Sequence, residues 1–194
     1  MQLLKNKKYI AGIDEAGRGP IAGPVSVGIV IVERGKESLL KNFIDSKKIS
    51  ERKREELFKQ LRFLKKDGLV FYKNSLISNK TIDKKGIIFA INKGIENCLK
   101  EIYEKNLEIF LDGGLNAPKK FLKQKTIIKG DSKVKVISAA SIVAKVLRDK
   151  KMISLSKKYP GYDLEKHKGY GTKNHYKKIK LKGCSSLHRK TFIH

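Results

Sequence analysis

Residues 9–32, YIAGIDEAGRGPIAGPVSVGIVIV, decide the fold of this 194-residue chain. Residues 9–14 and 24–32 are rich in apolar and β-branched side chains, and a glycine-rich connection separates them. This pattern predicts two neighbouring strands of one sheet. The apolar run at 21–32 is interrupted by glycine and proline and is far shorter than the roughly 20 residues that cross a bilayer. We therefore expect no membrane-spanning segment.

Beyond this stretch, strands and helices are predicted to alternate. The spacing of apolar residues predicts helices over residues 50–66, 81–105 and 136–151, a short helix after Thr172, and strands over 69–72, 107–111 and 126–129. A meander of strands followed by alternating elements indicates an α/β domain with a mixed sheet. We expect this domain to cover residues 1–158, with residues 159–194 as a C-terminal appendage.

The chain is strongly basic. It has 45 Lys and Arg against 19 Asp and Glu, so its formal net charge is +26. Such an excess favours a polyanionic partner, with nucleic acid the first candidate, although lysines spread along the whole chain do not settle the point. Cys98 and Cys184 form no metal-binding pair, and the first residues contain no export signal, which favours the reducing cytoplasm.

Four acidic residues occupy unusual places in this basic chain. Asp14 and Glu15 end the first predicted strand, Asp112 ends the strand at 107–111, and Asp131 follows the strand at 126–129. Strand ends of an open α/β sheet gather functional side chains at one edge. Carboxylates brought together there repel one another unless cations neutralise them. Oxygen ligands select Mg²⁺ or Mn²⁺, and a pair of such ions is suited to displacement at phosphorus.

Each acid also has an ordinary structural interpretation. Asp112 could belong to a turn, Asp131 could cap the following helix, and Asp14 with Glu15 could be exposed turn residues. Adjacent strand residues point to opposite faces, so Asp14 and Glu15 share a site only if the strand bulges or ends there. The nearby glycines favour such an irregularity.

The segment DEAGRGP at residues 14–20 resembles the opening motif of bacterial ribonuclease HII, the type 2 ribonuclease H. Further matches follow in the order of that family: DSKKIS (45–50), LDGG (111–114), GDSK (130–133), ISAASIVAKVLRD (137–149), HKGYGT (167–172) and HRKTF (188–192). The resemblance implies a ribonuclease H-like fold, with a five-stranded mixed sheet flanked by helices. It also implies a catalytic domain followed by a C-terminal helical appendage that binds substrate.

The resemblance assigns roles to residues of this chain. The catalytic, metal-binding acids of the family correspond to Asp14, Glu15, Asp112 and Asp131, and the implied cofactor is a pair of Mg²⁺ or Mn²⁺ ions. The substrate-binding residues implied are Gly17, Arg18, Gly19 and Tyr170, and Lys47 and Lys168 are candidate phosphate contacts. An aspartate at position 131 favours type 2 over type 3, because type 3 relatives usually have glutamate there.

The activity that the resemblance implies is hydrolysis of the phosphodiester 5′ of a ribonucleotide, in an RNA/DNA hybrid or within duplex DNA. The expected ends are a 3′-hydroxyl and a 5′-phosphate. We expect a cytoplasmic monomer, and no tail that could bind a sliding clamp follows His194. Two alternatives stay open at this point: a non-catalytic basic RNA-binding protein, and a type 3-like enzyme that prefers longer hybrids.

Overall fold

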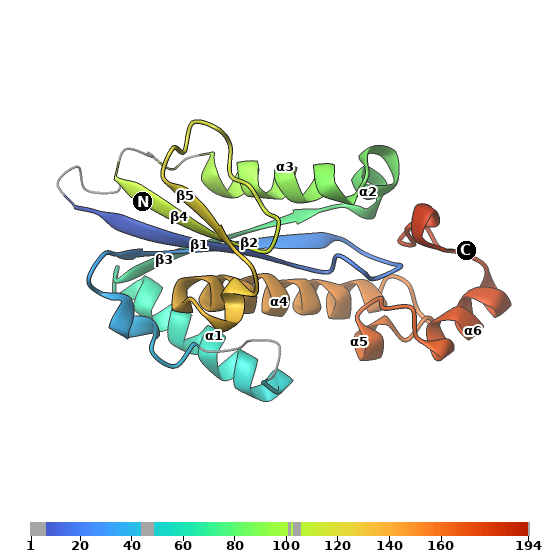
Figure 1. Ribbon diagram of the computed structural model, residues 1–194. Coiled ribbons are helices and arrows are strands. Elements are labelled where there is room, and N and C mark those ends of the chain that lie inside the picture. Colours follow the sequence, from blue (N-terminus) through green and yellow to red (C-terminus); the bar gives the residue numbers. More distant parts are fainter. Residues whose placement is uncertain (1–6, 44–48, 101, 103–105, 194) are drawn as a thin grey trace.

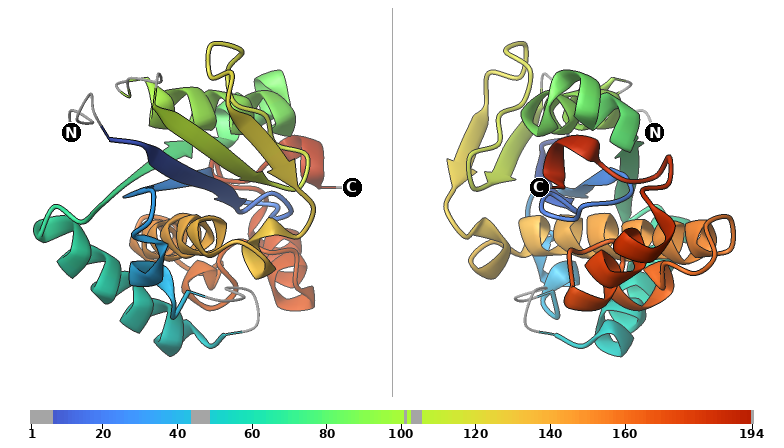
Figure 2. Two further views of the ribbon diagram at one scale, coloured as in Figure 1. Left: turned by 60° about the vertical axis from the view of Figure 1, so that its left-hand side comes forward. Right: turned by 90° about the vertical axis from the view of Figure 1, so that its right-hand side faces the viewer.

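The computed structural model describes residues 7–43, 49–100, 102 and 106–193. Five strands form one sheet in the order β3-β2-β1-β4-β5, with helices on both faces (Figures 1 and 2). The strands are β1 (Tyr9–Ala16), β2 (Val25–Glu33), β3 (Val70–Ile77), β4 (Leu107–Asp112) and β5 (Gln124–Ile127). The pairs β1–β2 and β2–β3 are antiparallel, whereas β1–β4 and β4–β5 are parallel. The predicted five-stranded mixed sheet is confirmed.

Helices α2 (Asn79–Lys85) and α3 (Ile87–Leu99) cover one face of the sheet (Figure 1). Cys98 is buried in this core, as its place on the apolar stripe of the helix predicts. The single helix predicted over residues 81–105 is wrong. Gly86 has φ 85° and ψ 161°, a conformation that ends α2 and starts a new helix. Helix α3 ends at Leu99, and residues 101 and 103–105 of the prediction lie outside the described residues.

The other face of the sheet packs against α1 (Glu51–Lys66) and α4 (Lys135–Ser156). Helix α4 runs unusually close to the strands. A Cβ added to Gly12 of β1 would lie 2.2 Å from the backbone of Val136, and one added to Gly28 of β2 would lie 2.4 Å from the carbonyl oxygen of Ala140. The glycines of β1 and β2 therefore allow α4 to pack closely on the sheet, alongside the end of β1.

Several element boundaries differ from those predicted. Strand β3 continues to Ile77, and β5 ends at Ile127 instead of residue 129, because the backbone at Lys129 is left-handed, with φ 54°. The predicted helix starts are confirmed: Ser50 accepts a hydrogen bond from the backbone N–H of Lys53 at the start of α1, and Thr172 caps α6 (Lys173–Lys182) in the same way. Short 3₁₀ turns lie at Glu37–Leu40, Gly130–Ser132 and Lys190–Phe192.

The C-terminal residues pack against the end of α4 and the β1–β2 loop. They include α5 (Leu164–His167) and α6, and they share a small apolar cluster with the rest of the chain: Ala22, Met152, Tyr162, Leu164 and Leu187. The predicted boundary at residues 158 and 159 falls between α4 and α5, and the division into two domains stays a prediction. Within the described part of the chain, no helix is both long and apolar enough to cross a membrane.

Candidate active site

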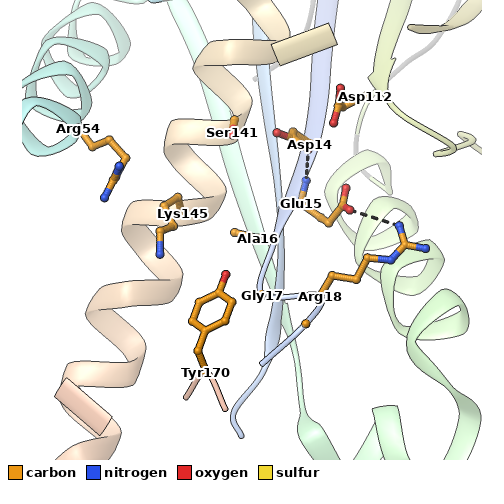
Figure 3. Close-up of a pocket in the computed structure, with 11 residues that line it drawn as sticks. Asp14, Glu15, Ala16, Gly17, Arg18, Arg54, Asp112, Ser141, Lys145 and Tyr170 are labelled. Atoms are coloured by element: carbon orange, nitrogen blue, oxygen red, sulfur yellow. Dashed lines mark hydrogen bonds and ion pairs between the residues drawn. The ribbon is translucent and has the colours of Figure 1, made fainter. Parts of the chain in front are cut away.

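A pocket of about 350 Å³ opens where β1 ends (Figure 3). Its lining comes from strands β1 and β4, the loop after β1, helices α1 and α4, and the segment before α6. The lining residues are Asp14, Glu15, Ala16, Gly17, Arg18, Gly19, Arg54, Asp112, Ser141, Lys145 and Tyr170. Segments far apart in the sequence therefore meet here, and they bring three of the four predicted acids to one place.

Asp14 and Glu15 reach this pocket without a bulge in the strand. The register of β1 with β2 is regular through Ala16, where the strand ends, so of the two expected arrangements, a bulge or a strand end, the structure has the strand end. The pairing of β1 with β4 ends earlier, at Ile13. Past Ile13 the strand has no ladder partner on its β4 side, and consecutive residues of β1 both border the pocket. The end of the parallel pairing with β4 thus allows Asp14 and Glu15 to border the same pocket without a bulge.

Asp14 is the most buried of the acids in the pocket, with 1% of its surface exposed. Its Oδ1 accepts a hydrogen bond from the backbone N–H of Glu15 at 2.7 Å, and its Oδ2 has no hydrogen-bond partner among the described residues. Burial raises the pKa of Asp14 well above its usual range, and the negative charges of Glu15 and Asp112 raise it further. This carboxylate therefore lies where a positive charge would be stabilised.

The neighbouring carboxylates each have a polar partner. Asp112 Oδ1 accepts a hydrogen bond from the backbone N–H of Gly130 at 2.6 Å, which ties the end of β4 to the turn after β5. Glu15 Oε1 lies 3.5 Å from Nη1 of Arg18 (Figure 3). The acids lie together at the strand ends, and cationic side chains from the loop, α1 and α4 line the same pocket.

The donor set suits a hard divalent cation. It consists of carboxylate oxygens, and the unpartnered Oδ2 of Asp14 is buried among like charges. Within the described residues, no three His, Cys, Asp or Glu side chains form a ready-made cage for a metal ion. Glu15 would have to exchange its contact with Arg18 for one with the metal. The residues present therefore fit a divalent ion, provided that their side chains rotate.

Comparison with known proteins agrees with this geometry. The sequence profile of the family "Ribonuclease HII" matches residues 11–194. A ribonuclease HII from Caldicellulosiruptor saccharolyticus is 42% identical over 191 residues, which cover 98% of this chain and 90% of that protein. The chain belongs to the ribonuclease HII family. It is a hydrolytic nuclease of the ribonuclease H type, and the alternative of a non-catalytic RNA-binding protein is set aside.

Solved structures of ribonuclease HII proteins share the fold. The ribonuclease H2 of Pyrococcus horikoshii superimposes with a TM-score of 0.75 at 28% identity, covering 94% of this chain and 93% of that one. The ribonuclease HII of Archaeoglobus fulgidus, solved in a complex with PCNA, gives a TM-score of 0.72 at 26% identity, covering 95% of each chain. The predicted ribonuclease H-like fold is confirmed.

The fourth predicted acid is not part of the pocket lining. Asp131 lies in the 3₁₀ turn that follows β5, and only 4% of its surface is exposed. Its neighbour Gly130 donates the hydrogen bond that fixes Asp112, so the turn is attached to the site through its backbone. The role of Asp131 as a ligand in this ribonuclease HII stays a prediction.

The predicted substrate-binding residues have different outcomes. Gly17, Arg18, Gly19 and Tyr170 line the pocket, and 43% of the Tyr170 surface is exposed. Lys168 does not line it: its Nζ donates to the carbonyl oxygen of Glu165 and lies 3.7 Å from a carboxylate oxygen of Glu51. Lys47 lies outside the described residues. None of these placements tests a role in binding, so the assignments stay predictions.

Four lining residues were not among the predicted ones: Ala16, Arg54, Ser141 and Lys145. Ser141 and Lys145 are four residues apart in α4, so they share a face of that helix. The Nζ of Lys145 lies 5.8 Å from the centre of the Tyr170 ring. The helical spacing could have linked Ser141 with Lys145, but no feature of the sequence indicates which face of the helix meets the pocket. Arg54, in the first turn of α1, carries no distinguishing signal.

Proposed function

We propose that this ribonuclease HII hydrolyses the phosphodiester on the 5′ side of a ribonucleotide, in an RNA/DNA hybrid or within duplex DNA. The products would carry 3′-hydroxyl and 5′-phosphate ends. The observation that carries the proposal is the meeting of Asp14, Glu15 and Asp112 with the Gly17–Arg18–Gly19 loop in one pocket. Groups suited to a phosphate reaction and groups suited to a sugar thus lie within one site.

The acids would hold the metal. Asp14, Glu15 and Asp112 line the pocket, and Asp131 lies one residue from the Gly130 amide that contacts Asp112. Bound Mg²⁺ or Mn²⁺ ions would supply a water of lowered pKa and stabilise the charge on the leaving oxygen. The chain then needs no nucleophilic side chain. Its acids keep the negative charges in place, and the backbone bonds from Glu15 and Gly130 fix their orientation.

The cations of the pocket would bind the nucleic acid backbone. Arg18 comes from the loop, Arg54 from α1 and Lys145 from α4, so three separate elements present positive charge to the pocket. Guanidinium and ammonium groups form charge-assisted hydrogen bonds with phosphate oxygens. These contacts are independent of base sequence, as expected of an enzyme that recognises a sugar.

Recognition of the ribonucleotide would depend on the loop and on Tyr170. A Cβ added to Gly19 would meet nothing within 4 Å, so the backbone there is open to a ligand. Its polar groups can reach a 2′-hydroxyl, which both donates and accepts hydrogen bonds. The ring of Tyr170, which is exposed and lines the pocket, would pack on a neighbouring deoxyribose and exclude an additional hydroxyl there.

A nicking assay tests the proposal. The substrates are duplex DNA with a single ribonucleotide, the all-DNA duplex of the same sequence, and a continuous RNA/DNA hybrid, each with Mg²⁺, Mn²⁺ or EDTA. We expect metal-dependent cleavage 5′ of the single ribonucleotide and none of the all-DNA duplex. Cleavage of the hybrid alone would support the type 3-like alternative. Cleavage that persists in EDTA would contradict the assignment of the acids.

The same preparation tests the remaining proposals. We propose that the protein acts as a monomer in the cytoplasm, and sedimentation velocity would reveal a dimer directly. The predicted lack of a clamp-binding tail stays a prediction, and the complex of the Archaeoglobus fulgidus protein with PCNA suggests the assay. Co-sedimentation of this chain with a sliding clamp would contradict the prediction.

A further inference from the structure

Two fully buried arginines hold the loop between β1 and β2, and neither belongs to the loop itself. Arg148 lies in α4 and Arg189 lies near the C-terminus, and both have 0% of their surface exposed. The loop they hold contains Gly17, Arg18 and Gly19, all of which line the pocket. The two buried arginines therefore support a loop that forms part of the candidate active site.

Arg189 uses three nitrogen atoms on three backbone carbonyls of this loop. Its Nη2 donates to the carbonyl oxygen of Gly17 at 2.7 Å, its Nη1 to that of Arg18 at 3.0 Å, and its Nε to that of Gly23 at 2.9 Å. The backbone N–H of Arg189 also donates to the carbonyl oxygen of Ile21 at 2.7 Å. The planar fork of a guanidinium is the side chain that can satisfy several fixed acceptors together.

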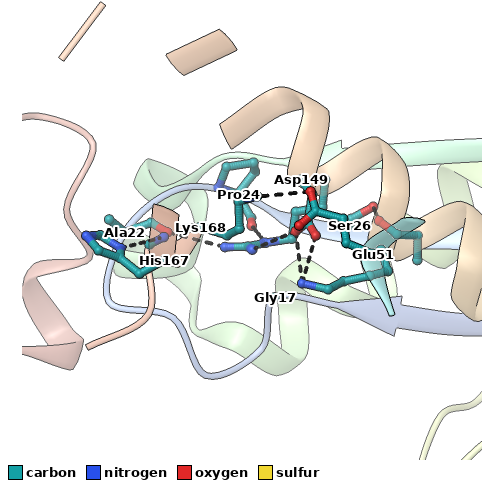
Figure 4. Close-up of polar contacts among 12 residues, drawn as sticks. Gly17, Ala22, Pro24, Ser26, Glu51, Asp149, His167 and Lys168 are labelled. Atoms are coloured by element: carbon teal, nitrogen blue, oxygen red, sulfur yellow. Dashed lines mark hydrogen bonds and ion pairs between the residues drawn. The ribbon is translucent and has the colours of Figure 1, made fainter. Parts of the chain in front are cut away.

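Arg148 bonds the later part of the same loop, at Ala22 and Pro24, which Figure 4 labels. Its Nε donates to the carbonyl oxygen of Pro24 at 2.9 Å and its Nη2 to that of Ala22 at 3.4 Å. Gly17 lies directly on its side chain, because a Cβ at Gly17 would lie 1.9 Å from Nε of Arg148. Arg148 therefore limits how far the loop can move inward, whereas the carbonyls of Gly17 and Arg18 are bonded by Arg189.

The contacts of Arg189 determine where two amide groups point. In a trans peptide the carbonyl of one residue and the N–H of the next point in opposite directions, and no described peptide bond is cis. Because buried Arg189 binds the carbonyls of Gly17 and Arg18, the N–H groups of Arg18 and Gly19 point away from it. Both residues are exposed, and within the described chain neither N–H has a hydrogen-bond partner.

We propose that Arg189 is a positioning residue, which orients the amides of Arg18 and Gly19 toward an oxygen atom of the bound nucleic acid strand. The proposal deepens the function proposed above and rests on it. Arg189 does not touch the substrate, and it acts through the loop. The acceptor is an oxygen of the ribonucleotide or of its phosphate, because two adjacent amide donors recognise oxygen acceptors of either kind.

The cost of burying Arg189 supports a role beyond fastening the chain. Burial, aided by the charge of Arg148, lowers the pKa of Arg189 to about 9, and the opposing charge of Asp83 does not offset this. A buried cation that makes no close ion pair costs stability, and neutral donors would hold carbonyls more cheaply. Positive charge directly behind two outward amides instead increases their attraction for an anionic strand.

The decisive variant is Arg189→Lys, which keeps the charge and loses the fork. We expect the kcat for duplex DNA with one ribonucleotide to fall about 100-fold, the effect of a small displacement of binding groups. Affinity for the all-DNA duplex distinguishes the two possible acceptors, because Arg18, Arg54 and Lys145 remain in the variant. It should be unchanged if the amides bind a ribose oxygen, and it should fall if they bind a phosphate oxygen. In Arg189→Ala, added ethylguanidinium should restore part of the lost kcat.

Leu187→Ala is the matched control, because Leu187 is a buried side chain of the same segment that does not bond the loop through its side chain. It should lose thermal stability while keeping its kcat, with no response to ethylguanidinium. If kcat falls in proportion to the loss of thermal stability in both Arg189→Lys and Leu187→Ala, the proposal is overturned. An Arg189→Lys enzyme with normal kcat would also overturn it.

A second measurement is independent of cleavage. In EDTA, amide NMR signals of Arg18 and Gly19 should shift when a duplex with one ribonucleotide is added to the wild type, and should shift less in Arg189→Lys. Equal shifts in the two proteins, or none in either, would overturn the proposal even where the wild type cleaves normally. A wild type that shows the amide shifts but never cleaves would contradict the proposed function alone.

If both Arg189 variants fail to fold, Asp83→Asn gives the test from outside the core. Asp83 accepts hydrogen bonds from the backbone N–H groups of Lys190 and Thr191, the residues that follow Arg189. Loosening Lys190 and Thr191 should lower kcat, as the Arg189 variants do, but by a smaller factor. An unchanged kcat in Asp83→Asn would then overturn the proposal.

Discussion

Asp14→Asn should stabilise the metal-free protein although it removes a residue of the active site. The Asp14 side chain has 1% of its surface exposed, its Oδ2 has no partner among the described residues, and the charges of Glu15 and Asp112 act against its ionisation. Asparagine keeps the shape of the side chain and the acceptor for the N–H of Glu15. It also replaces the unpartnered oxygen with a donor that can face the neighbouring carboxylates.

The size of the effect follows from the cost of an unsatisfied buried group. That cost is about 1–3 kcal/mol for a polar atom, and it is larger for a charged one. A gain of about 2 kcal/mol raises the melting temperature of a domain of this length by about 4–8 °C. Because the folded-state pKa of Asp14 lies above its unfolded value, protonation relieves the wild type as the pH falls. The advantage of Asp14→Asn should therefore grow as the pH rises above the usual pKa of an aspartate, and it should shrink in acid.

Thermal unfolding in EDTA, followed by circular dichroism at several pH values, measures this directly. Asp83→Asn is the matched control for charge. Although burial opposes it, hydrogen bonds from Thr191 and Lys190 lower the pKa of Asp83, so losing that carboxylate should lower the melting temperature. Added Mn²⁺ should stabilise the wild type and not Asp14→Asn. A metal-free Asp14→Asn that melts below the wild type, or parallel shifts in both variants, would refute the reasoning.

Three further predictions concern the site and the tail. Asp112→Asn should abolish cleavage in the nicking assay while largely sparing duplex binding, because a carboxylate is lost and the basic surface is kept; near-normal turnover would contradict its role. Duplex affinity should fall steeply with salt, and Arg54→Gln should reduce the slope of log K against log salt by about 0.9 if Arg54 contacts one phosphate; an identical slope would place Arg54 outside the interface. Burial lowers the pKa of His175 to about 4, so its contribution to stability is full above about 6.5 and is lost progressively as the pH falls toward 4. Between pH 7 and pH 5, the free energy of unfolding measured with urea should fall less in His175→Asn than in the wild type. Equal decreases would contradict the assignment of this pH dependence to His175.

The sequence predicted those features that depend on local chemistry. Residue type and the geometry of parallel strands predict the strand at β1, the helix starts near Ser50 and after Thr172, and the gathering of Asp14 and Asp112 at neighbouring strand ends. The break at Gly86 was missed, because the apolar spacing continues across it and only the backbone angle at one glycine interrupts the helix. The spacing of apolar residues indicates which side chains share one face of a helix, but it does not indicate the backbone dihedral angles of a single residue.

The parts of the site that depend on tertiary packing could not be predicted. Arg54 and Lys145 are two of 45 cations, and nothing in their own segments separates them from solvent-exposed lysines. The HRKTF motif marked the region of Arg189, but its contact with Gly17 joins residues 172 positions apart. Only the path of the whole chain places that guanidinium behind the loop. A motif can show that a residue is used, while its partners come from the fold.

Two buried charges of opposite sign, Asp14 and Arg189, lie near the end of β1 without forming an ion pair. Asp14, at the end of the strand, is an anion without a cationic partner within ion-pair distance among the described residues, and Arg189, behind the following loop, is a cation held by neutral carbonyls. A fold optimised for stability alone would pair such charges or replace them with apolar side chains. Here Asp14 lines the pocket from β1, and Arg189 bonds the carbonyls of the following loop. In the functions proposed above, Asp14 would attract a metal ion and the loop amides an anionic strand. Because these ligands are opposite in charge, keeping the two buried charges apart would let one short segment bind both.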